Sequence, residues 1–458
     1  MGRVEIKSRT KELLRISLPM AIEHISVSLM GMVSIMLISY VGEHATSALG
    51  VVDSVTHLIL ALFAALTTGG TIVVAQYMGR DDRKSAKRAG GQAIMLSAVF
   101  AMLMFVIIAV FRDPILAALF SDADYDVMEA SRTFLTIVNI SYPIVAITLT
   151  MFGIIRGTGN TFAPMVISVL MNVANLGLGF VLIRGINLGF VATPSFGIEG
   201  AAWALVISKA FGFVAAGYFL VKRAKGVRLN KLKYFIPDFK RQKAILRFGA
   251  PASFESGLFQ AGRLVTQIII VSMTTAAIAT NTIGFALMNF ANVPGMAFGT
   301  GAMILISQRI GRGDEKDVVR SSLFTLVVSG IFLVGIALII IVFMNPLFAL
   351  FNPSDETLQY LPIVVVSYLL IAPFFWPSSF ILPACLRATG DMIYTMVVSI
   401  GTMIFARILF AYILGIWLGM GIVGVWIAMY IDWVARSAFF YVRLFGGKWK
   451  GKGIMKNE

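Results

Sequence analysis

Twelve stretches of the chain are long, apolar and nearly free of charged side chains, and they restrict the possible folds severely. A helix needs about 20 such residues to cross the hydrocarbon core of a bilayer, where only helices and closed barrels satisfy their backbone hydrogen bonds. Charged residues make up 13% of the chain, against about 25% in soluble domains. The sequence therefore predicts an all-α integral membrane protein with twelve transmembrane helices, at about residues 16–41, 50–75, 93–111, 131–155, 163–184, 197–221, 247–271, 281–306, 320–344, 361–386, 393–417 and 420–445.

Lysine and arginine residues gather in alternate loops between these stretches. They precede the first stretch, follow the second and the eighth, fill the connection 222–246 and end the chain. The intervening loops are poor in them, and the loop after the third stretch is acidic. By the positive-inside rule, both termini and the 222–246 connection are cytoplasmic, in a multi-pass protein of the plasma (inner) membrane. The net charge of +15 reflects this topology, so we expect no nucleic-acid partner.

The chain matches itself when it is shifted by 232 residues. Residues 15–23 fall on residues 247–255, with an arginine, a proline and a glutamate at the same places. Six stretches separate the two copies, so equivalent helices run in the same direction, which indicates a parallel repeat about a pseudo-twofold axis along the membrane normal. The expected parts are an N-terminal six-helix lobe (1–221), a basic cytoplasmic linker (222–246), a C-terminal six-helix lobe (247–445) and a basic cytoplasmic tail (446–458).

Several short motifs together resemble those of the multidrug and toxic compound extrusion (MATE) transporters. Pro19-Met-Ala-Ile-Glu23 and Pro251-Ala-Ser-Phe-Glu255 resemble the Pro-x-x-x-Glu motif that opens helices one and seven in a bacterial branch of this family. The Arg-Gly-Thr-Gly turn at 156–159 adds to the likeness, which covers essentially the whole chain. The resemblance implies alternating access of two lobes and antiport, in which an amphipathic and often cationic drug or toxin leaves in exchange for protons or sodium ions.

The chain departs from the family pattern at two places. The resemblance implies an acid midway along helix one, where this chain has Ser34, and in another branch an acid in helix ten, where residues 375–382 contain none. The ion-coupling site is therefore expected among the acids that are present. A sodium ion, if that is the coupling ion, is expected at Glu255 or Asp53.

Glu255 is the first candidate for an ion-coupling or substrate-binding group. A charge inside an apolar span costs about 2.5 kcal/mol or more, which makes a functional role the default interpretation. A buried carboxylate can hold or release a proton, and a cationic cargo would compete with that proton, as antiport requires. The structural alternative is an ion pair with Arg263 or Arg407. Glu23, the counterpart of Glu255 in the first copy, has the same two interpretations, with Arg15 as its structural partner.

Other charged residues lie within the predicted spans. Asp53 and His57 are spaced i, i+4 and share one helical face, where an acid beside a histidine is a candidate proton relay. Lys209, Arg407 and Asp432 lie near the middles of three spans, where charges in helix bundles usually pair with one another. Such structural pairing is the favoured interpretation. If they are unpaired, Lys209 and Arg407 would instead suit an anionic substrate.

Other classes of function have less support. Membrane-enzyme and nucleotide-binding motifs are absent from the sequence, so we expect no enzyme, no nucleotide and no cofactor beyond the coupling ion. Cys385 is the single cysteine, and the three histidines do not form a metal-binding spacing. The expected partners of a monomer are a small-molecule substrate and the lipid bilayer. The main alternative is a flippase of the same superfamily for a lipid or a lipid-linked sugar, with a cationic cleft formed by Lys209, Arg263 and Arg407.

Overall fold

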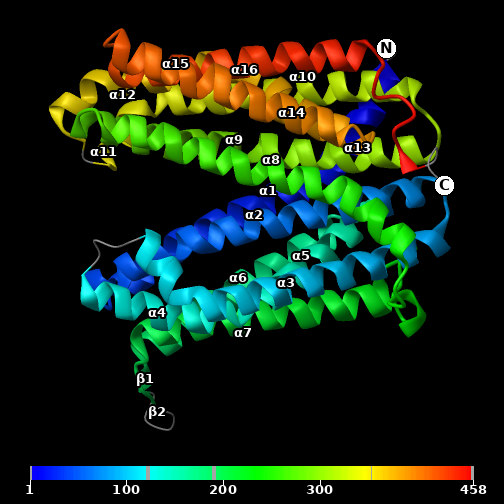
Figure 1. The fold of residues 1–458 in the computed structure, drawn as a ribbon, viewed down its shortest axis with the longest axis horizontal. Coiled ribbons are helices and arrows are strands. Elements are labelled where there is room, and N and C mark those ends of the chain that lie inside the picture. Colours follow the sequence, from blue (N-terminus) through cyan, green and yellow to red (C-terminus); the bar gives the residue numbers. More distant parts are fainter. Residues whose placement is uncertain (1–2, 120–123, 188–191, 352, 455–458) are drawn as a thin grey trace. The chain divides into compact units, whose positions relative to one another are not determined.

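The computed structural model describes residues 3–119, 124–187, 192–351 and 353–454, and most of them are helical (Figure 1). A π-helical turn, Phe219–Arg223, continues the last long helix of the first half. Two short strands, β1 (Ile186–Asn187) and β2 (Ala192–Thr193), pair antiparallel. The helices of this half are α1 (Arg3–Ser39), α2 (Glu43–Gly79), α3 (Arg83–Leu119), α4 (Tyr125–Asn139), α5 (Ser141–Gly157), α6 (Phe162–Arg184) and α7 (Gly197–Tyr218).

The second half of the chain repeats this series of long helices. A 3-10 turn at Leu232–Tyr234 precedes it, and π-helical turns occupy Pro377–Ile381, Met403–Ile408 and Ile413–Trp417. The helices of this half are α8 (Phe239–Val271), α9 (Thr275–Gly311), α10 (Lys316–Val342), α11 (Met344–Ala349), α12 (Asp355–Trp376), α13 (Leu382–Ala388), α14 (Met392–Thr402), α15 (Leu409–Tyr412) and α16 (Gly421–Phe445).

Each of the twelve predicted spans coincides with one of these helices or with a run of consecutive ones. Within the described residues, ten helices are long and apolar enough to cross a membrane, and α4 with α5, bent by 46° at their break, makes an eleventh span. The remaining predicted span, 247–271, lies in α8, which is long enough at 33 residues but carries Glu255, Gln260 and Arg263 in its apolar part. The prediction of an all-α membrane protein is therefore confirmed, with the β1–β2 hairpin as a small addition.

Polar side chains mark the starts of several helices. The Thr274 hydroxyl accepts a hydrogen bond from the Ala277 amide at the start of α9, and the Ser354 hydroxyl accepts one from the Thr357 amide at the start of α12. These amides belong to first turns, which have no partner within their own helix. These two hydrogen bonds therefore define the residues at which α9 and α12 begin. Both residues lie in loops between apolar stretches of the sequence.

The chain forms two compact units, one of residues 22–253 and the other of residues up to 21 together with those from 254 onward. The division falls within α1 and within α8, just after Pro19 and just after Pro251. Arg9, in the first part of α1, pairs with Asp317 of α10 at 2.5 Å. In the other unit, the backbone of Gly249, in the first part of α8, lies against Gly69 of α2. Each repeat thus receives the first part of a helix from the other.

In the unit of residues 22–253, α2 packs against α3, α4 and α5, while α7 packs along α6 and contacts α4 and α5. The Phe63 ring meets the edge of the Phe100 ring, with 6.1 Å between centroids. Because lipid tails are as apolar as these side chains, helices in a bilayer are held together largely by van der Waals contacts of this kind. The core of this unit includes side chains that are at most 1% exposed: Val52, Phe63, Phe134, Leu135 and Tyr142.

In the other unit, α9 packs against α10, α12 and α13, and α16 packs against α12, α14 and the π-helical turns. The α-helical pattern of α12 stops at Pro377, which has no N–H to donate, and a π-helical turn follows. Aromatic rings fill the space among these helices at centroid separations between 5.1 and 6.3 Å, and they are Tyr368, Trp376, Phe380, Trp426 and Trp433.

A Gly-Ile-x-Gly motif occurs at residues 197–200 and again at residues 421–424, and it has the same structural role in both copies. Gly197 and Gly421 have φ angles of +52° and +57°, a region that other residues rarely adopt. The second glycines, Gly200 and Gly424, lie against the backbone of the preceding helical segment, at Leu182 and Leu414 respectively. Both copies therefore use one glycine for the turn and one for the close approach.

Gly424→Ala is expected to destabilise the protein, because the added Cβ would lie 2.7 Å from the Leu414 carbonyl. Overpacking of this kind typically costs about 1–3 kcal/mol. The matched control is Gly335→Ala in α10, whose Cβ would meet nothing within 4 Å. Thermal unfolding in detergent should show a lower melting temperature for Gly424→Ala only. Equal melting temperatures for the two variants would contradict the close approach at Gly424.

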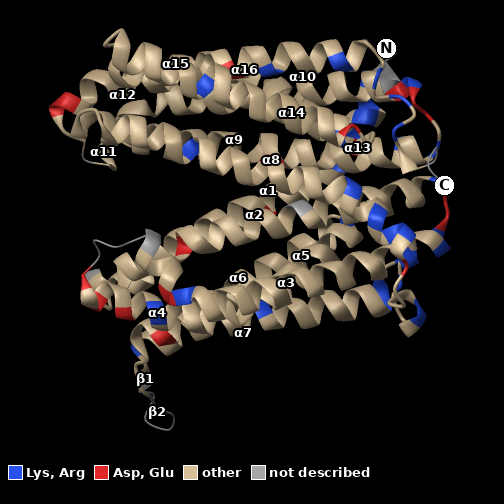
Figure 2. Ribbon diagram, viewed as in Figure 1, with Lys and Arg blue, Asp and Glu red and all other residues tan. Residues whose placement is uncertain are grey.

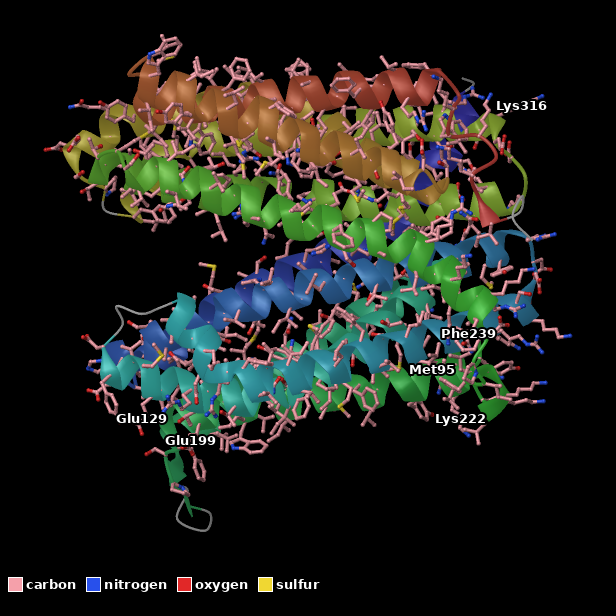
Figure 3. All side chains as sticks on the ribbon, viewed as in Figure 1. Met95, Glu129, Glu199, Lys222, Phe239 and Lys316 are labelled. Atoms are coloured by element: carbon pink, nitrogen blue, oxygen red, sulfur yellow. The ribbon has the colours of Figure 1, made fainter. Side chains whose placement is uncertain are left out.

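Charged residues lie mainly towards the helix ends, and fewer lie along the middles of the helices (Figure 2). In the unit of residues 22–253, Glu129 and Glu199 lie at one end and Lys222 lies at the other (Figure 3). The acidic and basic ends of this unit are thus separate, which agrees with the alternation of acidic and basic loops along the sequence. The charges that remain inside the spans are few, and they are the candidates for function.

Candidate functional site

The unit of residues 22–253 contains a cavity of about 270 Å³. This volume approaches the lower end of the range for ligand pockets, about 300–1,000 Å³. Its walls come from α1, α2, α4, α5, α6 and α7, and apolar side chains such as Leu60 and Phe134 form much of them. The polar side chains that line it are Ser34, Asp53, Thr56, His57, Ser141, Tyr142, Asn172, Asn175, Ser208 and Lys209.

The i, i+4 spacing of Asp53 and His57 on α2 brings both side chains to this cavity. Asp53 is half-buried and His57 is exposed. Neither side chain forms a hydrogen bond with another described residue, whereas the neighbouring Thr56 bonds Tyr142 at 2.9 Å. An acid and a histidine in one cavity, each without a hydrogen-bond partner among the described residues, can accept an ion or a ligand without breaking a contact first.

Ser34 and Lys209 face the same cavity from α1 and α7. Ser34 stands where the family resemblance implies an acid, so the carboxylate in this cavity comes from α2, as Asp53, and not from α1. Lys209 is half-buried and forms no ion pair or hydrogen bond with the described residues. The structural pairing expected for Lys209 is therefore not found in the part of the chain that is described.

Glu23 and Glu255 each pair with an arginine of the same repeated turn. The Glu255 carboxylate accepts hydrogen bonds from Arg387 at 3.1 Å and from the Ser399 hydroxyl at 2.9 Å. Glu23 pairs with Arg156 at 2.5 Å. The structural partners considered for these glutamates, Arg263, Arg407 and Arg15, were thus wrong, although the interpretation as ion pairs agrees with the structure.

The local sequence explains why both arginines take the same position. Arg156 and Arg387 lie in the last turns of α5 and α13. In each case the threonine two residues later donates its hydroxyl hydrogen to the carbonyl of the residue before the arginine, at 2.6 and 2.7 Å. A glycine with positive φ, Gly159 or Gly390, then ends the helix. The Arg-x-Thr-Gly turn is therefore a device that sets an arginine opposite the glutamate of its own repeat.

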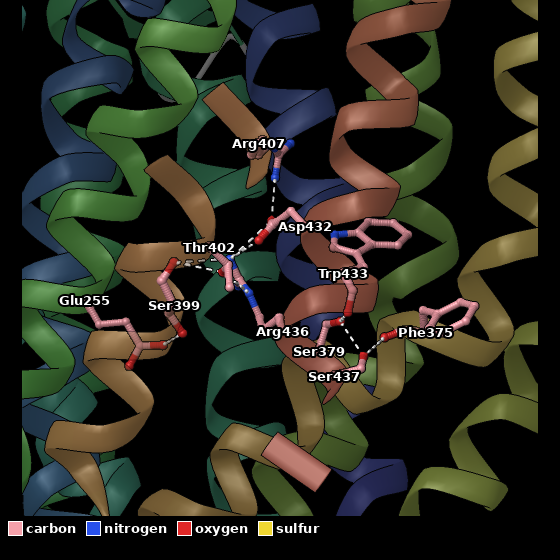
Figure 4. Close-up of polar contacts among 10 residues, drawn as sticks. All are labelled: Glu255, Phe375, Ser379, Ser399, Thr402, Arg407, Asp432, Trp433, Arg436 and Ser437. Carbon is pink, nitrogen blue, oxygen red and sulfur yellow. Dashed lines mark hydrogen bonds and ion pairs between the residues drawn. The ribbon is translucent and has the colours of Figure 1, made fainter. Parts of the chain in front are cut away.

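Asp432, Arg407 and Arg436 form a buried network in the other unit (Figure 4). Asp432 on α16 is fully buried and pairs with Arg436 one turn later at 3.1 Å, while Arg407 lies 4.0 Å from it. Arg436 also donates to the Thr402 hydroxyl at 3.3 Å and to the Ser399 carbonyl at 3.4 Å. Through Ser399 this network reaches Glu255. The expected pairing of Arg407 and Asp432 is present, and Arg436 is an additional member that the i, i+4 spacing to Asp432 could have indicated.

Arg263 on α8 takes no part in these ion pairs. It donates a long hydrogen bond to Gln260 at 3.4 Å and lies over the Phe285 ring at 5.6 Å. Cys385 is buried with a free thiol. Among the described residues, no three His, Cys, Asp or Glu side chains are grouped closely enough to hold a metal ion. The candidate residues thus separate into the cavity group of Asp53, His57 and Lys209, and the paired charges at the other positions.

Long apolar helices in two homologous halves, with charged groups inside the spans, are typical of transporters built from repeats. The MatE family model matches residues 19–181 and residues 251–413, which together are more than half of the chain. The two matches are 232 residues apart and begin at Pro19 and Pro251, the same displacement as the internal repeat. The chain belongs to the MatE family, the multidrug and toxic compound extrusion transporters.

Several known proteins are similar to this chain over most of their length. A probable multidrug resistance protein NorM of Thermotoga maritima is 25% identical over 463 residues, which cover 100% of this chain and 97% of that protein. An FAD transporter of Shewanella oneidensis is 22% identical over an alignment that covers 79% of this chain and 77% of that transporter. A transporter of the MOP superfamily from Pyrococcus furiosus, described as having reversed polarity of its binding pocket, superposes with a TM-score of 0.85 at 22% identity, covering 96% of both chains. The last comparison supports the fold.

Proposed function

We propose that the protein is a secondary active exporter that moves amphipathic small molecules out of the cell in exchange for protons or sodium ions. Membership of the MatE family and the multidrug resistance proteins among its relatives support export. The absence of nucleotide-binding motifs from the sequence supports an ion gradient as the energy source. We expect no enzymatic activity and no cofactor other than the ion.

The observation that carries this proposal is the cavity that contains Asp53 and His57. An ion-coupling group must release its ion when the cargo arrives, so it has to be accessible and free to change partners. Asp53 lines the cavity and has no hydrogen-bond partner among the described residues. Glu23 and Glu255 are already held by Arg156 and Arg387. We therefore assign ion coupling to Asp53, with His57 as an accessory group, and ion-pair roles to the two glutamates.

The proposed topology follows from the distribution of lysine and arginine. Both termini and the connection 222–246 are cytoplasmic in this proposal, and the protein is a monomer of the plasma membrane with lobes at 1–221 and 247–445. Alternating access of these lobes would expose the site to each side in turn. A cysteine introduced at Lys225 should react with a membrane-impermeant maleimide only after cells are opened, and labelling of intact cells would contradict this orientation.

The flippase alternative depended on a cleft formed by Lys209, Arg263 and Arg407. Of these, Lys209 lines the cavity of the unit of residues 22–253. Arg407 is buried next to Asp432 in the other unit, and Arg263 lies over Phe285. Lys209 thus belongs to one unit, and Arg263 and Arg407 belong to the other. The multidrug resistance proteins among the relatives make export of small molecules the better-supported function.

Transport by the purified protein in proteoliposomes tests the proposal. Movement of a fluorescent rhodamine would be followed under an imposed pH gradient and, separately, under an imposed sodium gradient, with protein-free liposomes as the control. One of the two gradients is expected to drive dye movement above the control, which identifies the coupling ion. Dye movement at the protein-free rate under both gradients would contradict the exporter proposal.

A further inference from the structure

Lys209 differs from the other cations that lie deep in the spans. It is in the middle of the span Gly197–Arg223, twelve residues from its start. Arg156 and Arg387 have glutamate partners, and Arg407 and Arg436 share Asp432. Lys209 has neither a carboxylate nor an aromatic ring as a partner among the described residues, and its side chain lines the cavity. A charge at this depth is costly unless something compensates it.

The other charges around the cavity limit what that compensation can be. Asp53 is the only carboxylate among its described lining residues, and the other titratable side chains there are His57, Tyr142 and Lys209. A purely cationic cargo would bring a second positive charge near Lys209. A purely anionic cargo would not compete with a proton or sodium ion at Asp53, because occupancy of Asp53 by a cation would strengthen anion binding. Antiport requires that competition.

We infer that the cargo is a zwitterionic amphiphile, whose acidic group, a carboxylate or a phosphate, pairs with Lys209 while its cationic group takes the place of the coupling ion at Asp53. The polar side chains of Asn172, Asn175 and Tyr142 line the same cavity and can offer hydrogen bonds to such a cargo. The apolar wall at Leu60 and Phe134 suits the hydrophobic part of such a molecule. This inference rests on the proposed function, of which it specifies the substrate class.

Equilibrium binding to the purified protein in detergent tests the inference separately from transport. Rhodamine 110 carries a free carboxylate beside its delocalised cation, and rhodamine 123 is its methyl ester, so the two probes differ by one acidic group. The native protein is expected to bind rhodamine 110 roughly tenfold or more tightly than rhodamine 123, since a charge-assisted hydrogen bond to Lys209 is available only to the acid. Equal affinity for the two dyes would overturn the inference.

Lys209→Met should abolish this preference by weakening rhodamine 110 and not rhodamine 123. Lys209→Arg keeps the charge and should retain the preference, so it serves if Lys209→Met does not fold. Lys222→Met, outside the cavity, is the matched control and should change neither affinity. Persistence of the preference in Lys209→Met would contradict the assignment. Dye movement at the protein-free rate combined with an intact binding preference would refute the exporter function and not the substrate class.

A zwitterion of this kind could be a soluble compound or the headgroup of a membrane lipid. Competition with a short-chain, water-soluble phosphatidylethanolamine distinguishes the two sources. Displacement of rhodamine 110 by glycine-like soluble zwitterions bearing an aromatic group, and not by this lipid, is the expected result. Displacement by neither class of compound would contradict a zwitterion site. Displacement by the lipid alone would replace the soluble cargo by a lipid headgroup and overturn that part of the inference.

Discussion

Asp53→Asn is expected to reduce ion-driven export to the rate of protein-free liposomes. Asparagine keeps the shape of the side chain but cannot carry the charge that holds a proton or sodium ion. Because Asp53 lines the cavity without a hydrogen-bond partner among the described residues, its loss leaves no buried partner unsatisfied. The variant should therefore fold normally and lose coupling. The measurement is rhodamine movement in proteoliposomes under the gradient that drives the native protein.

Glu255→Gln is the matched control for this experiment. It also neutralises a carboxylate inside a span, but one that is engaged by Arg387 and Ser399 and lies outside the cavity. We expect this variant to keep gradient-dependent export, with some loss of stability. The opposite result, in which Glu255→Gln abolishes coupling and Asp53→Asn does not, would move the ion site to the unit that contains residues 254 onward.

Asp432→Asn is expected to cause the largest loss of stability of the substitutions considered. Asp432 is fully buried, and both Arg436 and Arg407 depend on its charge. Removal of one partner from a buried ion pair typically costs about 3–5 kcal/mol, because the remaining charge is left uncompensated. Here two arginines would be left in this position. The measurement is the melting temperature in detergent, which should fall by several degrees more than that of Asp113→Asn, a change in an exposed pair.

The double variant Asp432→Asn with Arg436→Met isolates the origin of this effect. If the cost comes from uncompensated charge, removal of Arg436 should recover part of the stability, so that the double variant is more stable than the sum of the single changes predicts. Simple additivity of the two changes would mean that the contacts of Asp432 matter for packing and not for charge. Asp113, paired at the surface with Arg112 and Arg132, should show no such coupling.

The two repeats have diverged at comparable places. Lys209 and Asp432 lie at nearly equivalent positions of the sixth span in each copy. In the first copy the charged side chain faces a cavity without a partner, and in the second it is enclosed by two arginines. The Glu–Arg pair at the Pro-x-x-x-Glu motif has remained the same in both. Both copies have thus kept the Glu–Arg ion pair. They differ at the sixth span, where the charge faces a cavity in the first copy and is paired and buried in the second.

The spans and the repeat were predictable because both can be recognised along the linear amino-acid sequence. Hydropathy over about 20 residues is sufficient to identify a span, and the twelve predicted spans correspond to the observed helices. The unit boundaries are different, since the first parts of α1 and α8 pack with the opposite repeat. Order along the chain does not reveal such an exchange.

The partners of the charges were harder to predict, because they are distant in sequence. Glu255 is 132 residues from Arg387, and Glu23 is 133 residues from Arg156. Arg263 was a plausible partner of Glu255 because it is near in sequence, yet its guanidinium group lies over the Phe285 ring. The nearly equal separations in the two copies are a signal that could have identified both pairs. The convergence of Asp53 and Lys209 on one cavity has no comparable signal, since α2 and α7 are not related by the repeat.

The most direct test of ion coupling at Asp53 is the affinity of rhodamine 110 as a function of the coupling ion, measured across neutral pH and, at constant ionic strength, across sodium concentration. The native protein should bind the dye more weakly as the concentration of one ion rises, because cargo and ion compete for Asp53. Glu255→Gln should keep that dependence, and Asp53→Asn should show none. Retention of the full dependence in Asp53→Asn would contradict the assignment of ion coupling to the cavity of α2 and α7.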